Sequence, residues 1–427
     1  MEARLQLALD FVDLSRAKKL AAEAASGGVD WIEVGTPLIK SEGLDAVREL
    51  RRMFPNKKIV ADMKVMDTGR YEVEAAAKAG ADVVVLLGVA DDSTIREAVS
   101  AAKNFGCEIM VDLINVSDML PRAKKLESLG VDYVCVHVGI DQQMRGVDPI
   151  KEIKKLAKSL KIPLAVAGGI NSENAAAAVA AGASIVIVGG AITKSGNAKK
   201  ATELIIKAMK SGKVVKSGLY KKYVDPLQVL CKVSTANLAD AMHRSGDMEG
   251  IRKLTGSGRV VGRAVTVRAY PGDWSKPVEA IDAAGKGAII VIDAGGTGKA
   301  VWGELASQSC KVKGVVGVVI DGFARDIEDI AKIKFPVFAR GARPAAGEPK
   351  GFGEINVPIT CGGVDVKPGD FIVCDSDGVV VVPKEEAVEI ANRAQDISER
   401  ENRVREEIKE GSTLSKVLSL KKWEKTC

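Results

Sequence analysis

Short, continuous apolar runs separated by helical stretches make up the first 210 residues or so of the chain. The runs read LQLALD, WIEVG, KKIVADMKV, DVVVLLG, EIMVDLIN, YVCVHV, PLAVAGG and SIVIVGG. They are continuous rather than alternating, which is typical of parallel strands buried on both faces, and the segments between them, such as AVRELRRMF, have helical periodicity. Eight such units predict a closed (β/α)8 barrel, a fold whose working residues gather at the C-terminal ends of the strands.

The pattern changes after residue 212. Residues 213–227 are rich in Lys and Gly and break the strand–helix rhythm, so we expect a linker there. Residues 228–395 contain longer apolar runs with fewer helices, which predicts a compact α/β domain whose strands come from RVVGRAVTVRAY, AIIVIDAGG, GVVGVVIDG, PVFARG and DFIVCDSDGVVVVP. The sequence becomes charged and helical from about Glu385, and residues 396–427 are expected to form a helical tail. The barrel itself is assigned to residues 1–212.

Composition and charge narrow the classes of function. The chain is 46% hydrophobic and only 4% aromatic, as expected of an α/β enzyme with a large core. The net charge of +6 is spread along the sequence without a basic run, so small anions are more natural partners than nucleic acid. No apolar run approaches the roughly 20 residues of a membrane span, and the N-terminus lacks a signal-peptide pattern. Seven cysteines without CxxC spacing are expected to be reduced and buried, so we predict a cytoplasmic protein.

Ionisable side chains stand at the ends of five predicted barrel strands. These residues are Asp10, Glu33, Asp62 with Lys64, Asp112 and His137. In the segment IVADMKVMD, side-chain alternation would direct Asp62 and Lys64 to the same face, and Asp67 follows closely. Charges at the end of a buried strand need partners or a metal ion. A structural ion pair is the alternative, but it does not account for a ring of carboxylates around one Lys and one of only two His residues.

The last two barrel strands end in glycine pairs instead of charges. Gly168 and Gly169 follow the seventh strand, and Gly189 and Gly190 follow the eighth. Glycine allows backbone N–H groups to approach an anion, and a phosphate site after strands 7 and 8 is a recurrent feature of this fold. One such pair can also serve a tight turn, but two pairs at adjacent strand ends predict a phosphorylated small molecule as substrate.

The segments ALD, EVGTPLIK, VADMKVMDTG, HVGIDQQ, AVAGGI and IVGGAIT together resemble the 3-hexulose-6-phosphate synthases of the orotidine 5'-monophosphate decarboxylase superfamily, over about residues 3–210. The resemblance implies Mg²⁺ bound by Glu33 and Asp62 with substrate oxygens, and an enediolate stabilised by that metal and by Lys64. Oxygen ligands suit a hard divalent cation, and fixed positive charge is useful where an oxyanion develops. It also implies a homodimer in which Asp67 reaches the site of the neighbouring subunit.

The implied reaction is the aldol condensation of formaldehyde with D-ribulose 5-phosphate to D-arabino-hex-3-ulose 6-phosphate, or its reversal. His137 is the acid/base candidate because imidazole ordinarily titrates near neutral pH; a hydrogen-bonded core His is the alternative. Asp10, Asp62, Lys64, Asp67 and His137 form the set of candidate catalytic residues.

A sister activity, the decarboxylation of 3-keto-L-gulonate 6-phosphate, is the alternative function. The enzymes with that activity have a motif similar to HTGRD at the sixth strand. This chain has Ile140 at the position of the Arg and continues Asp141, Gln142, Gln143. The difference favours the synthase. Val138 departs from a Thr that is common in both groups.

The second domain, with VSTANLADAM, WGELAS, GVVIDGFARD and DGVVVVP, resembles the RraA-like family over about residues 228–395. That family includes ribonuclease E inhibitors, metal-dependent keto-acid aldolases and decarboxylases, and it forms trimers or hexamers. The catalytic members are marked by an acid, two residues, a second acid, twenty residues and then Arg-Asp. Glu304, Arg325 and Asp326 match this spacing, but Val301 occupies the position of the first acid. Asp326 is therefore a candidate ligand for a second divalent metal, and Arg325 for a substrate carboxylate. An Arg–Asp pair that closes a turn, and a protein whose second domain docks on a protein partner, are the alternatives.

Overall fold

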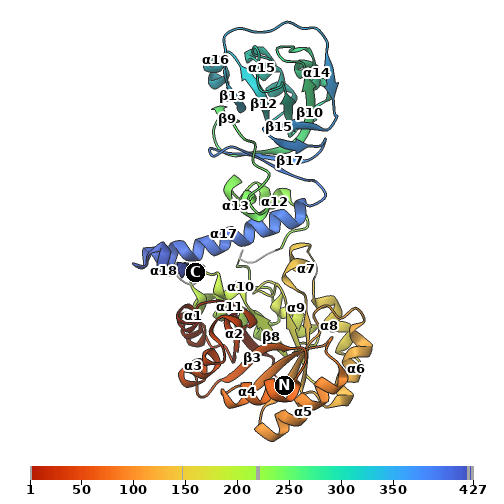
Figure 1. Ribbon diagram of the computed structural model, residues 1–427, viewed down its shortest axis with the longest axis vertical. Helices are drawn as coiled ribbons and strands as arrows, with labels where there is room; N and C mark the ends of the chain where they lie inside the picture. Colours follow the sequence, from red (N-terminus) through yellow and green to blue (C-terminus); the bar gives the residue numbers. More distant parts are fainter. Residues whose placement is uncertain (1, 147, 218–221, 421–423, 425–427) are drawn as a thin grey trace. The chain divides into compact units, whose positions relative to one another are not determined.

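A computed structural model describes residues 2–146, 148–217, 222–420 and 424, which divide into two compact units (Figure 1). The first unit comprises Met1–Lys222 and Glu399–Cys427, and the second comprises Tyr223–Ser398. Residues 218–221 of the expected linker and residues 421–423 and 425–427 of the expected tail, Cys427 included, lie outside the described residues.

The first unit contains the predicted closed barrel of eight parallel strands, each paired with its neighbours in sequence and β1 paired with β8. The strands are β1 (Arg4–Leu9), β2 (Trp31–Val34), β3 (Lys58–Val65), β4 (Val83–Leu87), β5 (Glu108–Asp112), β6 (Tyr133–His137), β7 (Leu164–Ala167) and β8 (Ile185–Val188). All eight coincide with the apolar runs of the sequence. The fold class predicted for this half of the chain is confirmed.

Figure 1 shows the helices of this unit arranged around the strands. They are α1 (Leu14–Ser26), α2 (Thr36–Glu42), α3 (Asp45–Met53), α4 (Gly69–Lys78), α5 (Asp92–Phe105), α6 (Met119–Leu129), α7 (Ile140–Met144), α8 (Ile150–Leu156), α9 (Ala175–Ala180), α10 (Gly190–Thr193), α11 (Ala198–Ser211) and, near the C-terminus, α18 (Leu414–Val417). Several begin at a capping side chain; Asn197, for example, accepts a hydrogen bond from the backbone N–H of Lys200 at 2.8 Å.

Apolar side chains fill the inside of the barrel, so its interior is a packed core and not a pore. The inward cluster consists of Ala8, Val60, Val83, Val85, Met110, Cys135, Ala165, Ala167, Ile185 and Ile187. A larger apolar layer lies between the strands and the outer helices. The barrel therefore presents its polar chemistry at the strand ends.

Three Asp residues hold the N-terminal ends of the strands in place. Asp30, Asp82 and Asp132 accept hydrogen bonds from the backbone N–H groups of Leu5, Ile59 and Ile109 at 2.9, 2.7 and 2.8 Å. Each links one loop to the neighbouring strand, and none lies at the end where catalytic residues gather. These carboxylates therefore support the fold.

The second unit is built on a mixed sheet with the order β18-β17-β10-β11-β12-β13-β9, to which β14 is added beside β10. Its strands are β9 (Arg252–Thr255), β10 (Val260–Ala269), β11 (Ala288–Asp293), β12 (Gly317–Ala324), β13 (Val337–Ala342), β14 (Gly353–Ile355), β17 (Phe371–Cys374) and β18 (Val379–Val382), and a separate hairpin contains β15 (Ile359–Cys361) and β16 (Val364–Val366). The mixed α/β fold is confirmed. The run DFIVCDSDGVVVVP forms two antiparallel strands joined by a turn, and the short strands β9, β14, β15 and β16 were not foreseen.

The helices of the second unit are α12 (Leu227–Leu230), α13 (Thr235–Ala241), α14 (Ser275–Ala283), α15 (Glu304–Lys313) and α16 (Ile327–Lys332). The charged segment near the C-terminus forms the 23-residue helix α17 (Ala387–Lys409), which runs through residue 396 without a break. Its residues to Ser398 belong to the second unit and those from Glu399 to the first.

The six described cysteines are all free, as predicted. Cys231 is exposed, however, so the expectation that the cysteines lie in the core does not hold for it. No helix within the described ranges is long and apolar enough to cross a membrane.

Candidate functional site

One cavity of about 430 Å³ lies at the C-terminal ends of the barrel strands. This volume falls in the range of about 300–1,000 Å³ that is usual for small-molecule sites. The cavity brings together most of the predicted residues: Asp10, Glu33, Asp62, Lys64, Asp112, His137, Gly168, Gly169, Gly189 and Gly190. The site therefore combines a charged side, supplied by β1, β2, β3, β5 and β6, with a glycine-rich side that follows β7 and β8.

Lys64 is held between two carboxylates at the centre of the charged side. Its Nζ lies 3.0 Å from Asp62 Oδ2 and 3.0 Å from Asp112 Oδ2. The expected meeting of Asp62 and Lys64 is confirmed, but β3 is irregular here: its register on β4 shifts between Ala61 and Val65, and Lys64 has a φ of +48°. A residue with a side chain rarely adopts this left-handed conformation, and such strain clusters at functional sites.

Asp112 joins Lys64 to His137. His137 Nδ1 lies 2.7 Å from Asp112 Oδ2, and the backbone N–H of Ile114 donates to Asp112 Oδ1 at 2.9 Å. Burial raises the pKa of Asp112, but the hydrogen bond to His137 and the charge of Lys64 outweigh it, and the pKa falls below its usual value. Burial likewise lowers the pKa of Lys64, and the two carboxylates more than reverse this. Lys64 therefore stays protonated and Asp112 stays ionised.

Glu33 is buried next to the other acids of the cavity. Burial and then the charges of Asp62 and Asp10 raise its pKa well above the usual value, although Gln6 Nε2 donates to Glu33 Oε2 at 2.6 Å. The cavity holds four carboxylates against one ammonium group, so it has an excess of negative charge. A cation near Glu33 would compensate this excess.

The donors present fit the implied Mg²⁺. Mg²⁺ usually keeps several waters and takes one or two protein carboxylates together with substrate oxygens, which Glu33 and Asp62 can supply. Thr36 fixes Asp62, since its Oγ1 donates to Asp62 Oδ2 at 2.7 Å. Among the described residues there is no group of three or more His, Cys, Asp or Glu side chains arranged to hold a metal without such additional oxygens.

The glycine-rich side depends on backbone that tolerates no side chain. Gly168 has a φ of +106°, and a Cβ on it would lie 2.5 Å from the carbonyl oxygen of Val138. The neighbouring Gly169 has a φ of +70°. The close contact between the loop after β7 and the end of β6 thus requires glycine. The same glycine backbone, which carries no side chains, lines the cavity.

Three polar residues of the cavity were not identified from the sequence: Gln6, Thr36 and Gln143. The side-chain oxygens Gln6 Oε1 and Gln143 Oε1 are buried and have no hydrogen-bond partner among the described residues. Such acceptors suit hydroxyl donors of a ligand. A polar residue within the apolar run LQLAL was the available signal for Gln6. Thr36 and Gln143 lie in helices α2 and α7, outside the apolar runs, and had no such signal.

Asp67 does not line this cavity. It is exposed beyond the end of β3, where Thr68 Oγ1 lies 3.5 Å from Asp67 Oδ1. The structure therefore separates Asp67 from Asp62 and Lys64 within one chain.

The second unit has a smaller cavity, of about 330 Å³, lined by Arg325 and Asp326 together with Val301 and Glu304. Arg325 Nε lies 3.5 Å from Asp326 Oδ2, which also accepts a hydrogen bond from the backbone N–H of Glu304 at 3.2 Å. Val301 is buried in the apolar core. Position 301, where the catalytic members of the family have their first acid, thus contributes no oxygen ligand here.

Gly295 and Gly296, which follow β11, do not line that cavity. Gly296 lies beside an ion pair between Arg340 and Asp321 that was not predicted. Asp321 Oδ2 also accepts a hydrogen bond from the backbone N–H of Gly362 at 2.7 Å.

Comparison with known proteins divides the chain in the same two parts. Residues 3–205 match the family described as orotidine 5'-phosphate decarboxylase/HUMPS, and residues 235–381 match the RraA-like family, described as Aldolase/RraA. A 3-hexulose-6-phosphate synthase of Bacillus subtilis is 42% identical over 207 residues, which cover 47% of this chain and 98% of that protein. The uncharacterized protein MJ0644 of Methanocaldococcus jannaschii is 46% identical over 198 residues, covering 45% of this chain and 94% of that protein.

We predict that Glu33→Gln stabilises the barrel in the absence of divalent ions. The folded-state pKa of Glu33 is raised, so its ionisation opposes folding, and this cost grows as the pH rises above its ordinary value of 4.5. We expect the free energy of unfolding at pH 8, measured by urea titration, to be higher for Glu33→Gln than for the wild type. The gain should shrink towards pH 4.

Glu97→Gln, at an exposed position of α5, is the matched control and should change little. Mg²⁺ should stabilise the wild type and have less effect on Glu33→Gln. Lower stability of Glu33→Gln at pH 8 would contradict the assignment of Glu33 as an uncompensated buried acid.

Proposed function

The chain belongs to the orotidine 5'-phosphate decarboxylase/HUMPS family in its N-terminal half and carries an RraA-like domain in its C-terminal half, and from this membership we propose that the barrel is a sugar-phosphate aldolase. The proposed reaction is the Mg²⁺-dependent condensation of formaldehyde with D-ribulose 5-phosphate to D-arabino-hex-3-ulose 6-phosphate, or the reverse cleavage. The observation that carries the proposal is the Lys64 ammonium held between Asp62 and Asp112, in a cavity that glycine loops complete.

Each side of the cavity suits one part of the substrate. The backbone around Gly168, Gly169, Gly189 and Gly190 can receive a phosphate group, because the absence of side chains lets N–H groups approach the anion. The unpartnered oxygens of Gln6 and Gln143 can accept hydrogen bonds from sugar hydroxyls. A phosphorylated ketose would then place its carbonyl end beside Lys64.

The chemistry needs a proton to leave C1 of ribulose 5-phosphate and the resulting enediolate carbon to attack the carbon of formaldehyde. One C–C bond forms, and the former formaldehyde oxygen takes up a proton. Lys64, fully protonated, stabilises the negative oxygen of the enediolate. His137 is the candidate for moving the proton, since Asp112 holds Nδ1 and leaves Nε2 for exchange.

Mg²⁺, when bound by Glu33 and Asp62, would supply positive charge and Lewis acidity to the substrate oxygens. Asp10 lies on the same side of the cavity, where the Cβ of any residue replacing Gly35 would come 2.3 Å from its Oδ1. We propose that Asp10 assists in orienting the substrate.

Decarboxylation of 3-keto-L-gulonate 6-phosphate is the competing activity. Ile140, at the position where the sequence pattern of those enzymes has an Arg, lines the cavity and offers it an apolar side chain. An apolar group cannot stabilise the carboxylate or the charge that decarboxylation releases, which favours the aldol reaction.

We propose a non-catalytic role for the second unit. Without an acid at Val301 a divalent ion would be held weakly by Asp326, so we expect little keto-acid cleavage. Arg325 lines an otherwise largely apolar cavity, where it can bind a small acid or phosphate. We further propose that the barrel forms homodimers, that the RraA-like domain assembles trimers or hexamers, and that the protein works in the cytoplasm. Docking of this domain on a protein partner is the regulatory alternative.

Lys64→Ala and Asp62→Asn should each lower formaldehyde consumption with ribulose 5-phosphate and Mg²⁺ by at least about 10²–10³-fold. Each removes charge that the transition state needs, and comparable electrostatic contacts contribute that much. Lys78→Ala, on the exposed face of α4, should keep wild-type activity. More than a tenth of wild-type turnover in either site variant would contradict the proposal.

Asp67 and Asp62 should complement each other across subunits, because Asp67 lies outside the cavity of its own chain. Mixing inactive Asp67→Ala with inactive Asp62→Ala chains is expected to restore up to about a quarter of the activity, since one site in each heterodimer would receive both intact residues. Verified heterodimers without any recovery would show that the site is not shared.

A further inference from the structure

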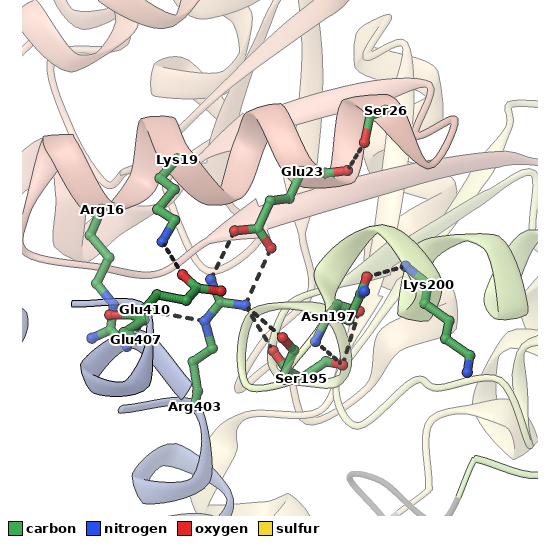
Figure 2. A network of polar contacts seen from close by, with 11 residues as sticks. Arg16, Lys19, Glu23, Ser26, Ser195, Asn197, Lys200, Arg403, Glu407 and Glu410 are labelled. Carbon is green, nitrogen blue, oxygen red and sulfur yellow. Dashed lines mark hydrogen bonds and ion pairs between the residues drawn. The ribbon is translucent and has the colours of Figure 1, made fainter. Parts of the chain in front are cut away.

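The end of helix α17 is part of the barrel unit, although it lies outside both regions that match known families. The family matches cover residues 3–205 and 235–381, whereas the compact barrel unit includes Glu399–Cys427. The guanidinium of Arg403 is one of the groups that anchor this segment. Its side chain is only 3% exposed. Figure 2 shows Arg403 between α1 and the loop that leads into α11.

Complementary charges bring the segment to α1. Arg16, Lys19 and Glu23 follow one another at helical spacing on α1, and they meet Glu407, Glu410 and Arg403 in turn. The Arg403–Glu23 contact is the most enclosed: Nη2 lies 2.9 Å from Glu23 Oε1, and Nη1 lies 3.2 Å from Oε2. Arg403 Nε donates to Glu407 Oε1 at 2.9 Å.

Arg403 also reaches the loop between β8 and α11. Its Nη1 donates to the carbonyl oxygen of Ser195 at 3.1 Å and to that of Gly196 at 3.4 Å. Ser195 is itself buried, and its Oγ donates to the carbonyl oxygen of Asn197 at 3.1 Å. One cationic group thus contacts two loop carbonyls, and the carbonyl of Ser195 belongs to a buried residue, where an unpaired acceptor is costly.

Hydrogen bonds continue from that loop to the cavity. The backbone N–H of Ser195 donates to Ile192 at 3.2 Å, and the N–H of Ile192 donates to Gly189 at 3.0 Å. Gly189 and Gly190 line the barrel cavity. The position of Arg403 is therefore linked, through three consecutive contacts, to the backbone that the proposed function assigns to the substrate phosphate.

We propose that Arg403 is a positioning residue for the barrel site, which fixes the loop after β8 so that it binds the phosphate of the sugar substrate. This inference rests on the proposed function in one respect, namely that the glycine loop receives a phosphate group. An ion pair with Glu23 would suffice to dock the helix; the additional donors to Ser195 and Gly196 act on the loop.

Arg403→Lys in the full-length chain tests the inference. Lysine keeps the charge opposite Glu23, but one ammonium group cannot reproduce a planar fork that contacts Glu23, Glu407 and two carbonyls together. We expect the KM for ribulose 5-phosphate to rise by about tenfold, which corresponds to about 1.4 kcal/mol of binding, with kcat within about twofold of wild type. Arg403→Met, which also removes the charge, should raise KM further.

Calorimetric titration with inorganic phosphate gives a second measurement that does not depend on turnover. The Kd for phosphate should weaken by a similar factor in Arg403→Lys. Arg405→Met is the matched control, because the exposed Arg405 on the same helix forms hydrogen bonds with Glu401 and Asn402 of its own helix. It should leave both KM and the phosphate Kd unchanged.

The outcomes separate this inference from the proposed function. Folded Arg403→Lys with unchanged KM and unchanged phosphate Kd, or with a loss confined to kcat, would overturn the positioning role. Wild-type protein that binds phosphate in an Arg403-dependent way but does not consume formaldehyde would support the positioning of an anion loop and refute the aldolase. If Arg403→Met does not fold, the KM and phosphate Kd of Arg403→Lys still test the positioning role.

Discussion

The placement of one ammonium group between two buried carboxylates is the constraint on which the barrel site depends. Lys64 lies 3.0 Å from both Asp62 and Asp112, and the end of β3 adopts a left-handed backbone at Lys64 where these contacts are made. The neighbouring groups follow from this placement. Thr36 restrains Asp62, and Asp112 reaches His137 through the same oxygen that contacts Lys64. Strain at Lys64 is thus stabilised by ionic contacts with one carboxylate of the same strand, Asp62, and one of β5, Asp112.

Much of the fold could be predicted because the barrel strands are buried on both faces and therefore appear as continuous apolar runs. The charged residues at the strand ends were equally visible, since Asp62, Lys64 and His137 interrupt or end those runs. Gln6 was missed because a single amide in an apolar strand gives no indication of what it contacts. The shift in the register of β3 on β4, between Ala61 and Val65, was not predicted either, because the pattern of apolar residues along one strand does not give its register on the next.

Contacts between distant parts of the sequence were the least predictable. Arg403 and Glu23 are 380 positions apart, and a charged helix by its composition alone can be a solvated tail as well as a packed element. The short strands β14, β15 and β16 have three residues each, too few for an alternating pattern to emerge. In the second unit the spacing of Glu304, Arg325 and Asp326 was visible, and their common cavity follows from the fold of β12 and α15.

The central claim is that the barrel joins formaldehyde to a phosphorylated pentulose. The most direct measurement uses wild-type protein, Mg²⁺, ribulose 5-phosphate and ¹³C-labelled formaldehyde, with the product followed by ¹³C NMR. We expect a new hydroxymethyl signal at C1 of hex-3-ulose 6-phosphate, which is absent without Mg²⁺ and is lost again when formaldehyde is trapped. Label that remains entirely in hydrated formaldehyde at saturating substrate would contradict the account.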